Sequence, residues 1–328
     1  SLHDALPILR SRNLSVAVTG IGYDGEDLDN LTFLPKPRIT LEKDTLIATS
    51  SLTLDTAKLK YELLSNTGIF TPLGEILIAK VTEAGKIVVA GPNNIRDLKK
   101  IIAAFKYINP DLLFVDGAMN RMAPMYLVDK LIFSTGASRN ISIDLITDEM
   151  QTIASLFRKK VFPQYVETAS CLLIKNDKVT ETGIPSLLSE KDLATLLLLN
   201  PDKFDSLVLK GIFSPDLLKE LITDILKKRK EFKFGFLEPF RLLLSMDTIC
   251  MNSYQKLFPE GIDIFFGIMP KLIAVTVNSF YPKYENFHFL PGYIDKDELK
   301  DKVSSALSET VVDIFSDGSE KLSEMIIG

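Results

Sequence analysis

The chain has 328 residues, of which 46% are hydrophobic and 25% charged, and its formal net charge is −5. These values are typical of a soluble globular protein with one large α/β domain or two smaller ones. A nucleic-acid surface is not expected, because no basic run exceeds Lys227-Lys228-Arg229-Lys230. That run ends an amphipathic helix, where positive charges interact favourably with the negative end of the helix dipole.

Two scarce residue types exclude several kinds of site. Cys171 and Cys250 are the only cysteines, and they do not form a Cys-x-x-Cys pair, so neither a disulfide framework nor a zinc site is indicated. His3 and His288 are the only histidines, so few residues could serve as the base of a Ser-His-Asp triad. With no apolar stretch long enough to span a membrane and no visible signal peptide, we expect a cytoplasmic protein without membrane contact.

Residues 1–8 resemble the translation of a common sequencing-library adapter. We therefore expect the protein itself to begin near Leu9 and leave residues 1–8 out of the predicted fold. A genuine short helix is the alternative. If the adapter interpretation holds, the lack of a Gly-x-x-x-x-Gly-Lys-Ser/Thr loop says nothing about the intact protein.

The first predicted strand, residues 14–18, leads into a loop rich in glycine and acid. Gly20, Gly22 and Gly25 allow positive φ and leave backbone amides able to face an anion. Asp24 and the acids after it would repel phosphate unless a metal ion lay between them. The loop is therefore either a contact to a Mg²⁺-nucleotide or a solvated turn.

The next elements alternate between helical and strand patterns. Residues 52–64 have helical periodicity, and residues 74–81 with 86–90 resemble a β-hairpin. A helix is predicted over residues 95–107, with Asn94 as its N-cap.

Residues 112–115 are four apolar residues in a row, which predicts a parallel strand buried on both faces. Asp116 and Gly117 follow at its carboxyl end, where ligands collect in such sheets. An acid at this point holds Mg²⁺ in many nucleotide-binding α/β proteins. The alternative is a turn in which Asp116 bonds to its own backbone.

A second strand end resembles the first. Residues 131–133 form an apolar run that leads into Thr135 and Gly136, and a helix is predicted over residues 143–157. We expect this loop to lie at the same sheet edge as Asp116, which favours a ligand site.

The remaining chain is more mixed, and a boundary is predicted near Phe162, dividing the protein into residues 9–162 and 163–328. The main predicted strands are residues 206–209, 232–236, 241–244 and 271–277, with a helix over residues 215–230. The last of these strands ends at Asn278.

Several short segments occur in an order that resembles a known family. They are Thr19–Glu26, Lys36–Ile39, Asp44–Thr49, Thr67–Ile69, Thr71–Glu75, Ala90–Pro92, Val115–Ala118 with Arg121, Thr135–Ser138, Leu209–Gly211 and Ala274–Asn278. Together they resemble the P-loop subunit of the factor that reactivates cobalamin-dependent lysine and ornithine aminomutases, truncated at its N-terminus. The order of the segments carries the resemblance, since none is distinctive alone.

The resemblance implies an α/β fold with a mostly parallel sheet and flanking helices, similar to P-loop NTPases. It would lack the first strand and phosphate loop and carry β-rich insertions. It also implies an ATP- and Mg²⁺-dependent protein that acts with a MutS-like ATPase subunit on an aminomutase whose adenosylcobalamin is damaged. Without the upstream Gly-Lys-Thr loop, we expect this chain alone to bind nucleotide poorly.

Site residues are carried over only at matched positions. Asp24 and Asp116 are the candidate Mg²⁺ ligands, Gly25, Thr135 and Gly136 are nucleotide-loop residues, and Asn278 is a candidate contact to the base. Two departures stand against this match: Tyr23 replaces an expected basic residue, and Asn120 lies in a segment that is usually less bulky.

Two other functions fit the same residues. One is an ATP-dependent ligase of the dethiobiotin-synthetase type, for which the sequence offers no general base in a convincing setting. The other is a nucleotide-free interaction scaffold whose acidic loops are solvated.

Overall fold

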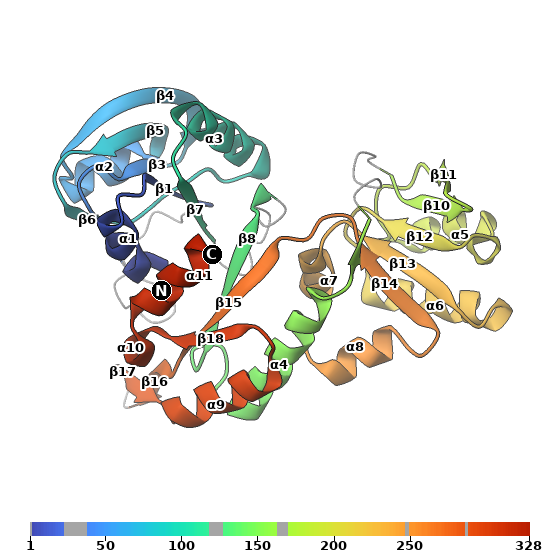
Figure 1. Cartoon of the computed structure of the whole chain (residues 1–328). Coiled ribbons are helices and arrows are strands. Elements are labelled where there is room, and N and C mark those ends of the chain that lie inside the picture. Colours follow the sequence, from blue (N-terminus) through green and yellow to red (C-terminus); the bar gives the residue numbers. More distant parts are fainter. Residues whose placement is uncertain (1, 23–37, 118–126, 163–169, 247–248, 286–287) are drawn as a thin grey trace. The chain divides into compact units, whose positions relative to one another are not determined.

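The computed structural model describes residues 2–22, 38–117, 127–162, 170–246, 249–285 and 288–328, and its fold is mixed α/β with several sheets (Figure 1). Two compact units make up the chain. The first comprises Ser1–Arg139, Ile273–Lys300 and Thr310–Gly328, and the second Asn140–Leu272 and Asp301–Glu309. Phe162, near which the sequence suggested a boundary, lies within the second unit.

The first unit contains most of the strands. Its elements, in chain order, are α1 (Leu2–Ser11), β1 (Val16–Gly20), β2 (Ile39–Leu41), β3 (Leu46–Ser50), α2 (Ser51–Ala57), β4 (Tyr61–Thr71), β5 (Gly74–Val81), β6 (Gly85–Ile87), α3 (Ile95–Ile108), β7 (Leu112–Asp116), β8 (Lys130–Gly136), β15 (Lys271–Asn278), β16 (Phe280–Glu285), β17 (His288–Tyr293), α9 (Lys296–Ala306), β18 (Thr310–Asp313), α10 (Ile314–Asp317) and α11 (Ser319–Ile327). Of these, β15 and α9 continue into the second unit.

The main sheet of the first unit has the strand order β4-β5-β3-β1-β7. β1 pairs in parallel with β3 and with β7, whereas β5 is antiparallel to both β3 and β4. Three smaller sheets complete the unit, with orders β18-β15-β8, β16-β17 and β2-β6. The expected parallel arrangement therefore holds for β3, β1 and β7, and the sheet as a whole is mixed.

The two faces of this sheet are covered by different elements because side chains alternate along each strand. Ala17 of β1 faces a cluster that contains Ile101 and Phe105 of α3. Val16 and Val18 face the opposite cluster, which contains residues of α1, α11 and β15. The central strands β1 and β3 are accordingly buried along their whole length.

The helix α1 includes most of the segment that resembles adapter sequence. Leu6 and Leu9 lie in the hydrophobic core with Leu322 and Ile326 of α11, and Leu6 is 2% exposed. In this structure the helix therefore covers part of the main sheet.

The second unit is built around one sheet. Its elements are α4 (Ile143–Leu156), β9 (Lys160–Val161), β10 (Leu172–Lys175), β11 (Lys178–Glu181), α5 (Glu190–Leu198), the 3-10 helix η4 (Pro201–Lys203), β12 (Ser206–Leu209), α6 (Pro215–Lys228), β13 (Phe232–Phe236), α7 (Pro239–Ser245), α8 (Met251–Leu257) and β14 (Ile262–Phe266). The strand order is β11-β10-β12-β13-β14-β9, in which β12, β13, β14 and β9 run parallel, and β10 is antiparallel to both of its neighbours, β11 and β12.

Aromatic side chains fill the core of the second unit. The ring of Phe236 lies 5.3 Å from that of Phe213 and 5.9 Å from that of Phe258, measured between centroids. Phe234, in the same strand as Phe236, and Phe266, which is paired with Phe236 in the neighbouring β14, are also fully buried. Burial of several phenylalanines on one sheet accounts for a substantial part of the unit's stability.

Three local predictions were wrong or incomplete. The helix expected over residues 52–64 ends at Ala57, and β4 begins at Tyr61. β5 and β6 do not form a hairpin, because β5 pairs with β3 and β4 and β6 pairs with β2. Residues 241–244 lie in α7 and not in a strand.

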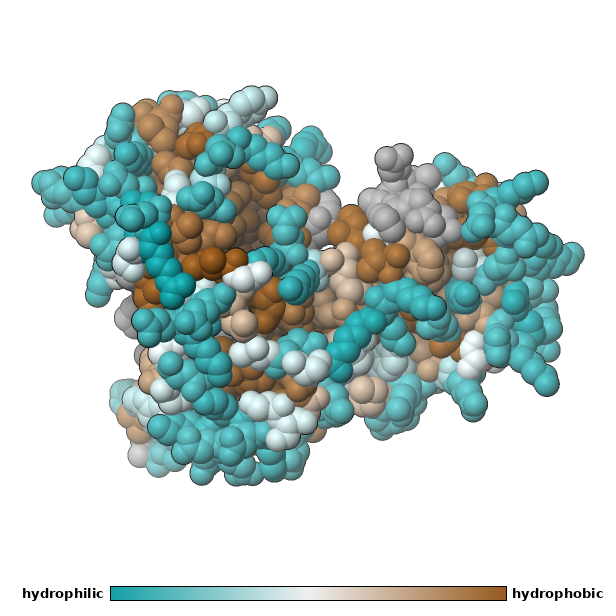
Figure 2. All heavy atoms as spheres, in the orientation of Figure 1, coloured by the Kyte–Doolittle hydropathy of each residue, from teal (hydrophilic) through white to brown (hydrophobic). Residues whose placement is uncertain are grey.

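The outer strand β4 carries hydrophobic side chains on the surface, and Figure 2 shows such side chains among hydrophilic ones in this region. Leu63 is 48% exposed and Phe70 is 76% exposed.

Among the helices of the described residues, none is both long and apolar enough to cross a bilayer.

Candidate functional site

The end of β1 lies directly beside Asp116. Gly20 is paired with Asp116 in the parallel register of β1 and β7, and the Ile21 amide donates to the Asp116 carbonyl oxygen over 3.0 Å. The next residue, Gly22, has φ of 66° and donates from its amide to the Pro92 carbonyl over 2.7 Å. The strand end that leads toward Asp24 is thus held beside the exposed Asp116.

A segment around Gly91 packs against the same strand end. A Cβ atom on Gly91 would lie 1.9 Å from the Gly20 carbonyl oxygen, so only glycine fits there. The preceding residue, Ala90, donates from its amide to Thr49 Oγ1 over 2.8 Å and accepts at its carbonyl from the Ser50 amide over 3.0 Å. This segment therefore ties together the carboxyl ends of β1 and β3, and β7 pairs directly with β1.

Asp24 and Gly25 fall in residues 23–37, outside the described part of the chain. Within the described residues no cluster of three or more His, Cys, Asp or Glu side chains that could hold a metal ion is found. The carboxylate of Asp116 has the donor chemistry that Mg²⁺ prefers, but it is a single ligand.

Thr135, Gly136 and Asn278 come together in the three-stranded sheet. The Ala137 amide donates to the Asn278 carbonyl oxygen over 2.9 Å, and Thr276 Oγ1 lies 2.7 Å from Ser134 Oγ. Gly136 ends β8 and Asn278 ends β15, so the carboxyl ends of these strands meet.

The side chain of Asn278 has a structural partner. Its Oδ1 accepts a hydrogen bond of 2.9 Å from the Phe280 amide, which closes a turn between β15 and β16. The Phe280 carbonyl in turn accepts from Ser138 Oγ over 3.0 Å. The Asn278 side chain is therefore accounted for by its hydrogen bond to the backbone of this turn. Its contact with a nucleotide base stays a prediction.

The two groups of predicted site residues belong to different sheets. Asp116 ends β7 in the five-stranded sheet, whereas Gly136 and Asn278 belong to the sheet β18-β15-β8. The expectation that both loops follow strands of one sheet was therefore wrong. β7 was also expected to be buried on both faces, but residues 112–115 are half-buried and Asp116 is exposed, because β7 is the last strand of its sheet.

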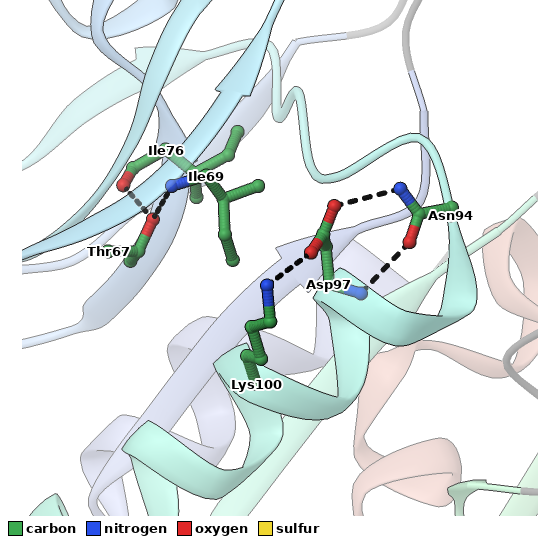
Figure 3. A network of polar contacts seen from close by, with 6 residues as sticks. All are labelled: Thr67, Ile69, Ile76, Asn94, Asp97 and Lys100. Carbon is green, nitrogen blue, oxygen red and sulfur yellow. Dashed lines mark hydrogen bonds and ion pairs between the residues drawn. The ribbon is translucent and has the colours of Figure 1, made fainter.

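Other segments of the family resemblance have local structural roles. Thr67 Oγ1 donates to the Ile76 carbonyl over 2.6 Å and accepts from the Ile69 amide over 3.1 Å, within a bulged part of β4 (Figure 3). The Gly68 amide and the Asn66 side chain both donate to Glu75. These bonds lower the pKa of Glu75, with the bond from Gly68 contributing most.

The start of α3 shows a complete N-cap. Asn94 Oδ1 accepts from the Asp97 amide over 3.0 Å, and the Asp97 carboxylate accepts from the Asn94 side chain and from Lys100, each over 2.8 Å (Figure 3). The hydrogen bond from Lys100, followed by that from Asn94, lowers the pKa of Asp97. The predicted role of Asn94 as N-cap is confirmed.

The second unit holds a group of buried ionisable residues that the sequence analysis did not single out as a site. Lys210 follows β12 and is 5% exposed, and Glu238 follows the parallel neighbour β13 and is 6% exposed. Glu238 accepts from the Phe240 amide over 2.9 Å and forms an ion pair of 3.0 Å with Arg241 Nε. The available signals were a lysine directly after an apolar strand and a glutamate before Pro239.

The buried setting changes how these groups ionise. Burial, reinforced by the positive charge of Arg241, lowers the pKa of Lys210. Burial also raises the pKa of Glu238, although Arg241 acts against it. Cys171, fully buried nearby in the fold of the second unit, has its thiol pKa raised by burial, as suits a packing residue.

Comparison with known proteins gives no match: no family model, no curated protein and no solved structure matches this chain.

Proposed function

We propose that this chain is part of an ATP-dependent accessory protein that reactivates a cobalamin-dependent lysine or ornithine aminomutase, acting with a MutS-like ATPase subunit. The ordered sequence segments support this function. So does the convergence of Gly20–Gly22, the Gly91 segment and Asp116 at the carboxyl ends of parallel strands. Open α/β sheets bind nucleotides at this edge.

In this proposal the fold of the first unit is a P-loop NTPase-like sheet, of which β3, β1 and β7 form the parallel part. Asp116, with Asp24, would hold Mg²⁺ beside the nucleotide. The bound metal ion would neutralise phosphate charge. Gly91 allows the backbone to approach Gly20 closely, and the hydrogen bond from Gly22 to Pro92 holds the end of β1.

The nucleotide state would act on a partner by favouring one position of the loop that follows Gly22. A ligand shifts such an equilibrium only as far as its affinities for the two positions differ. Among the described residues, the Gly22–Pro92 hydrogen bond and the exposed carboxylate of Asp116 mark the strand ends from which this proposal starts.

The test is association of the whole chain with a lysine or ornithine aminomutase and its MutS-like subunit, measured by sedimentation velocity with and without MgATP. We expect the wild-type chain and Asp111→Asn to join the complex equally, and Asp116→Asn to bind at least about tenfold more weakly, a loss of roughly 1.4 kcal/mol. Asp111 is the matched control because it precedes the same strand at the opposite end, where it accepts from the Ser15 amide.

The outcomes separate the proposed function from its alternatives. Absence of any complex with the wild-type chain would contradict the accessory function. Equal binding by Asp116→Asn and the wild-type chain would favour a nucleotide-free scaffold. Formation of a carboxylated or aminated small-molecule product from MgATP would favour a ligase instead.

A further inference from the structure

A groove lies between α6 and α8 in the second unit, with a volume of about 370 Å³. Its apolar lining comes from Ile222 and Leu226 of α6 together with Leu257 and Pro259. Ile222 and Leu257 are 2% and 7% exposed and form its floor, whereas Leu226 and Pro259 are more accessible. The groove therefore offers apolar contact area that is open to solvent.

Three exposed lysines surround this apolar lining. Lys219 and Lys227 come from α6 and Lys256 from α8. On α6 the two lysines are eight residues apart, so they lie on one face of the helix, about two turns from each other. The cations thus border the groove on both helices.

Two basic residues next to Lys227, Lys228 and Arg229, are already engaged in other contacts. Lys228 forms an ion pair of 2.8 Å with Asp224 and a second with Asp202 over 3.5 Å. The Arg229 guanidinium donates to the main-chain carbonyl of Phe204. Within the described residues, by contrast, no ion pair is formed by any of the three groove lysines.

We propose that the groove binds an acidic segment of a partner protein that places one bulky apolar side chain between α6 and α8. The volume is near the lower limit of ligand pockets and suits a single large side chain. Carboxylates on either side of that side chain would meet the lysines. Charged pairs at such a rim act mainly through association rate and salt dependence.

The chain as a whole is acidic, with a net charge of −5, so general attraction cannot bring an acidic partner to it. Binding must depend on the local positive potential around Lys219, Lys227 and Lys256. This makes the site testable by charge removal at these positions.

The probe is a fluorescently labelled 12-residue peptide of glutamates and serines with one central phenylalanine, titrated with the full chain. The groove variant is Lys219→Gln/Lys227→Gln/Lys256→Gln. Its matched control removes three exposed lysines elsewhere in the same unit, by Lys175→Gln/Lys178→Gln/Lys191→Gln. Thermal unfolding of both variants verifies that each is folded.

We expect the groove variant to bind the peptide at least about tenfold more weakly than the wild type, and the control variant to stay within about twofold. Replacing the phenylalanine with serine should weaken binding by a similar factor, and salt should weaken it further. Equal loss in both variants, no dependence on the phenylalanine, or binding of anionic phosphatidylserine vesicles without binding of the peptide would each overturn the proposal.

Discussion

A Cβ atom added to Gly136 would lie 2.0 Å from the carbonyl oxygen of Asn278. This contact joins the ends of β8 and β15, and the adjacent Ala137 amide bonds to the same oxygen. We expect Gly136→Ala to push the two strand ends apart and to lower the free energy of unfolding by about 3 kcal/mol.

Urea denaturation followed by circular dichroism measures this loss. Gly183→Ala is the control, because Gly183 has φ of 74° but no atom within 4 Å of an added Cβ. Its cost should be about 1 kcal/mol, from backbone conformation alone. Equal losses in the two variants would show that the approach to Asn278 is not limiting.

Gly91 and Gly20 provide a matched pair at the carboxyl end of β1. We expect Gly91→Ala to be destabilising by about 3 kcal/mol, because its Cβ would lie 1.9 Å from the Gly20 carbonyl oxygen. Gly20→Ala should cost less than about 1 kcal/mol, because its nearest contact would be an ordinary 3.5 Å. Thermal unfolding of the two variants compares them, and a more stable Gly91→Ala would refute the close approach.

Substitution of Thr49 tests the hydrogen bond between its hydroxyl and the Ala90 amide, which holds the residue before Gly91. Its buried hydroxyl accepts from the Ala90 amide over 2.8 Å. Thr49→Val keeps the shape but leaves that amide without its acceptor, so we expect a loss of about 2 kcal/mol in chemical denaturation. Thr56→Val is the control, since Thr56 is exposed and donates only within its own helix. A loss no larger than that of the control would indicate that Ala90 finds another acceptor.

The sequence was sufficient where local pattern decides structure. The apolar run before Asp116 predicted β7, and Asn94 predicted the start of α3. It failed for β4, because residues 61–71 are stabilised by pairing with β5 and not by their own periodicity. Pairing between distant segments is not encoded in any short window of sequence.

In the candidate site, too, local sequence patterns predicted some features, whereas contacts between distant segments could not be predicted. The position of Asp116 at a strand end followed from residues 112–115, but its pairing with Gly20 follows from contacts between distant parts of the chain. The close contact of Gly136 with Asn278 joins residues far apart in sequence, so no local signal could reveal it. Lys210 and Glu238 were missed because only the fold buries them, after the neighbouring parallel strands β12 and β13.

Glu309 and Arg158 should make stability depend on pH. Arg158 donates to Glu309 through Nε over 3.1 Å and Nη2 over 2.6 Å. Burial alone raises the pKa of Glu309, but the hydrogen bonds and charge of Arg158, with hydrogen bonds from the Glu309 backbone and from Ser308, lower it more, so the net pKa lies below its ordinary value. A lowered carboxyl pKa gives stability that is complete above the unfolded pKa, about 4.3, and is lost as pH falls through the folded pKa.

Glu309→Gln removes this contribution. Because the Arg158 side chain is 46% exposed, solvent screening limits the effect, and we expect about 1 kcal/mol of lost stability near pH 6.5. The difference from wild type should shrink as the pH falls below about 4.3, as measured by urea denaturation from pH 6.5 downward. Glu83→Gln is the control, since its pair with Lys60 is exposed on both sides, 63% and 68%, and should contribute little at either pH. A difference between wild type and Glu309→Gln that stays constant with pH would show that the pair acts through packing and not through charge.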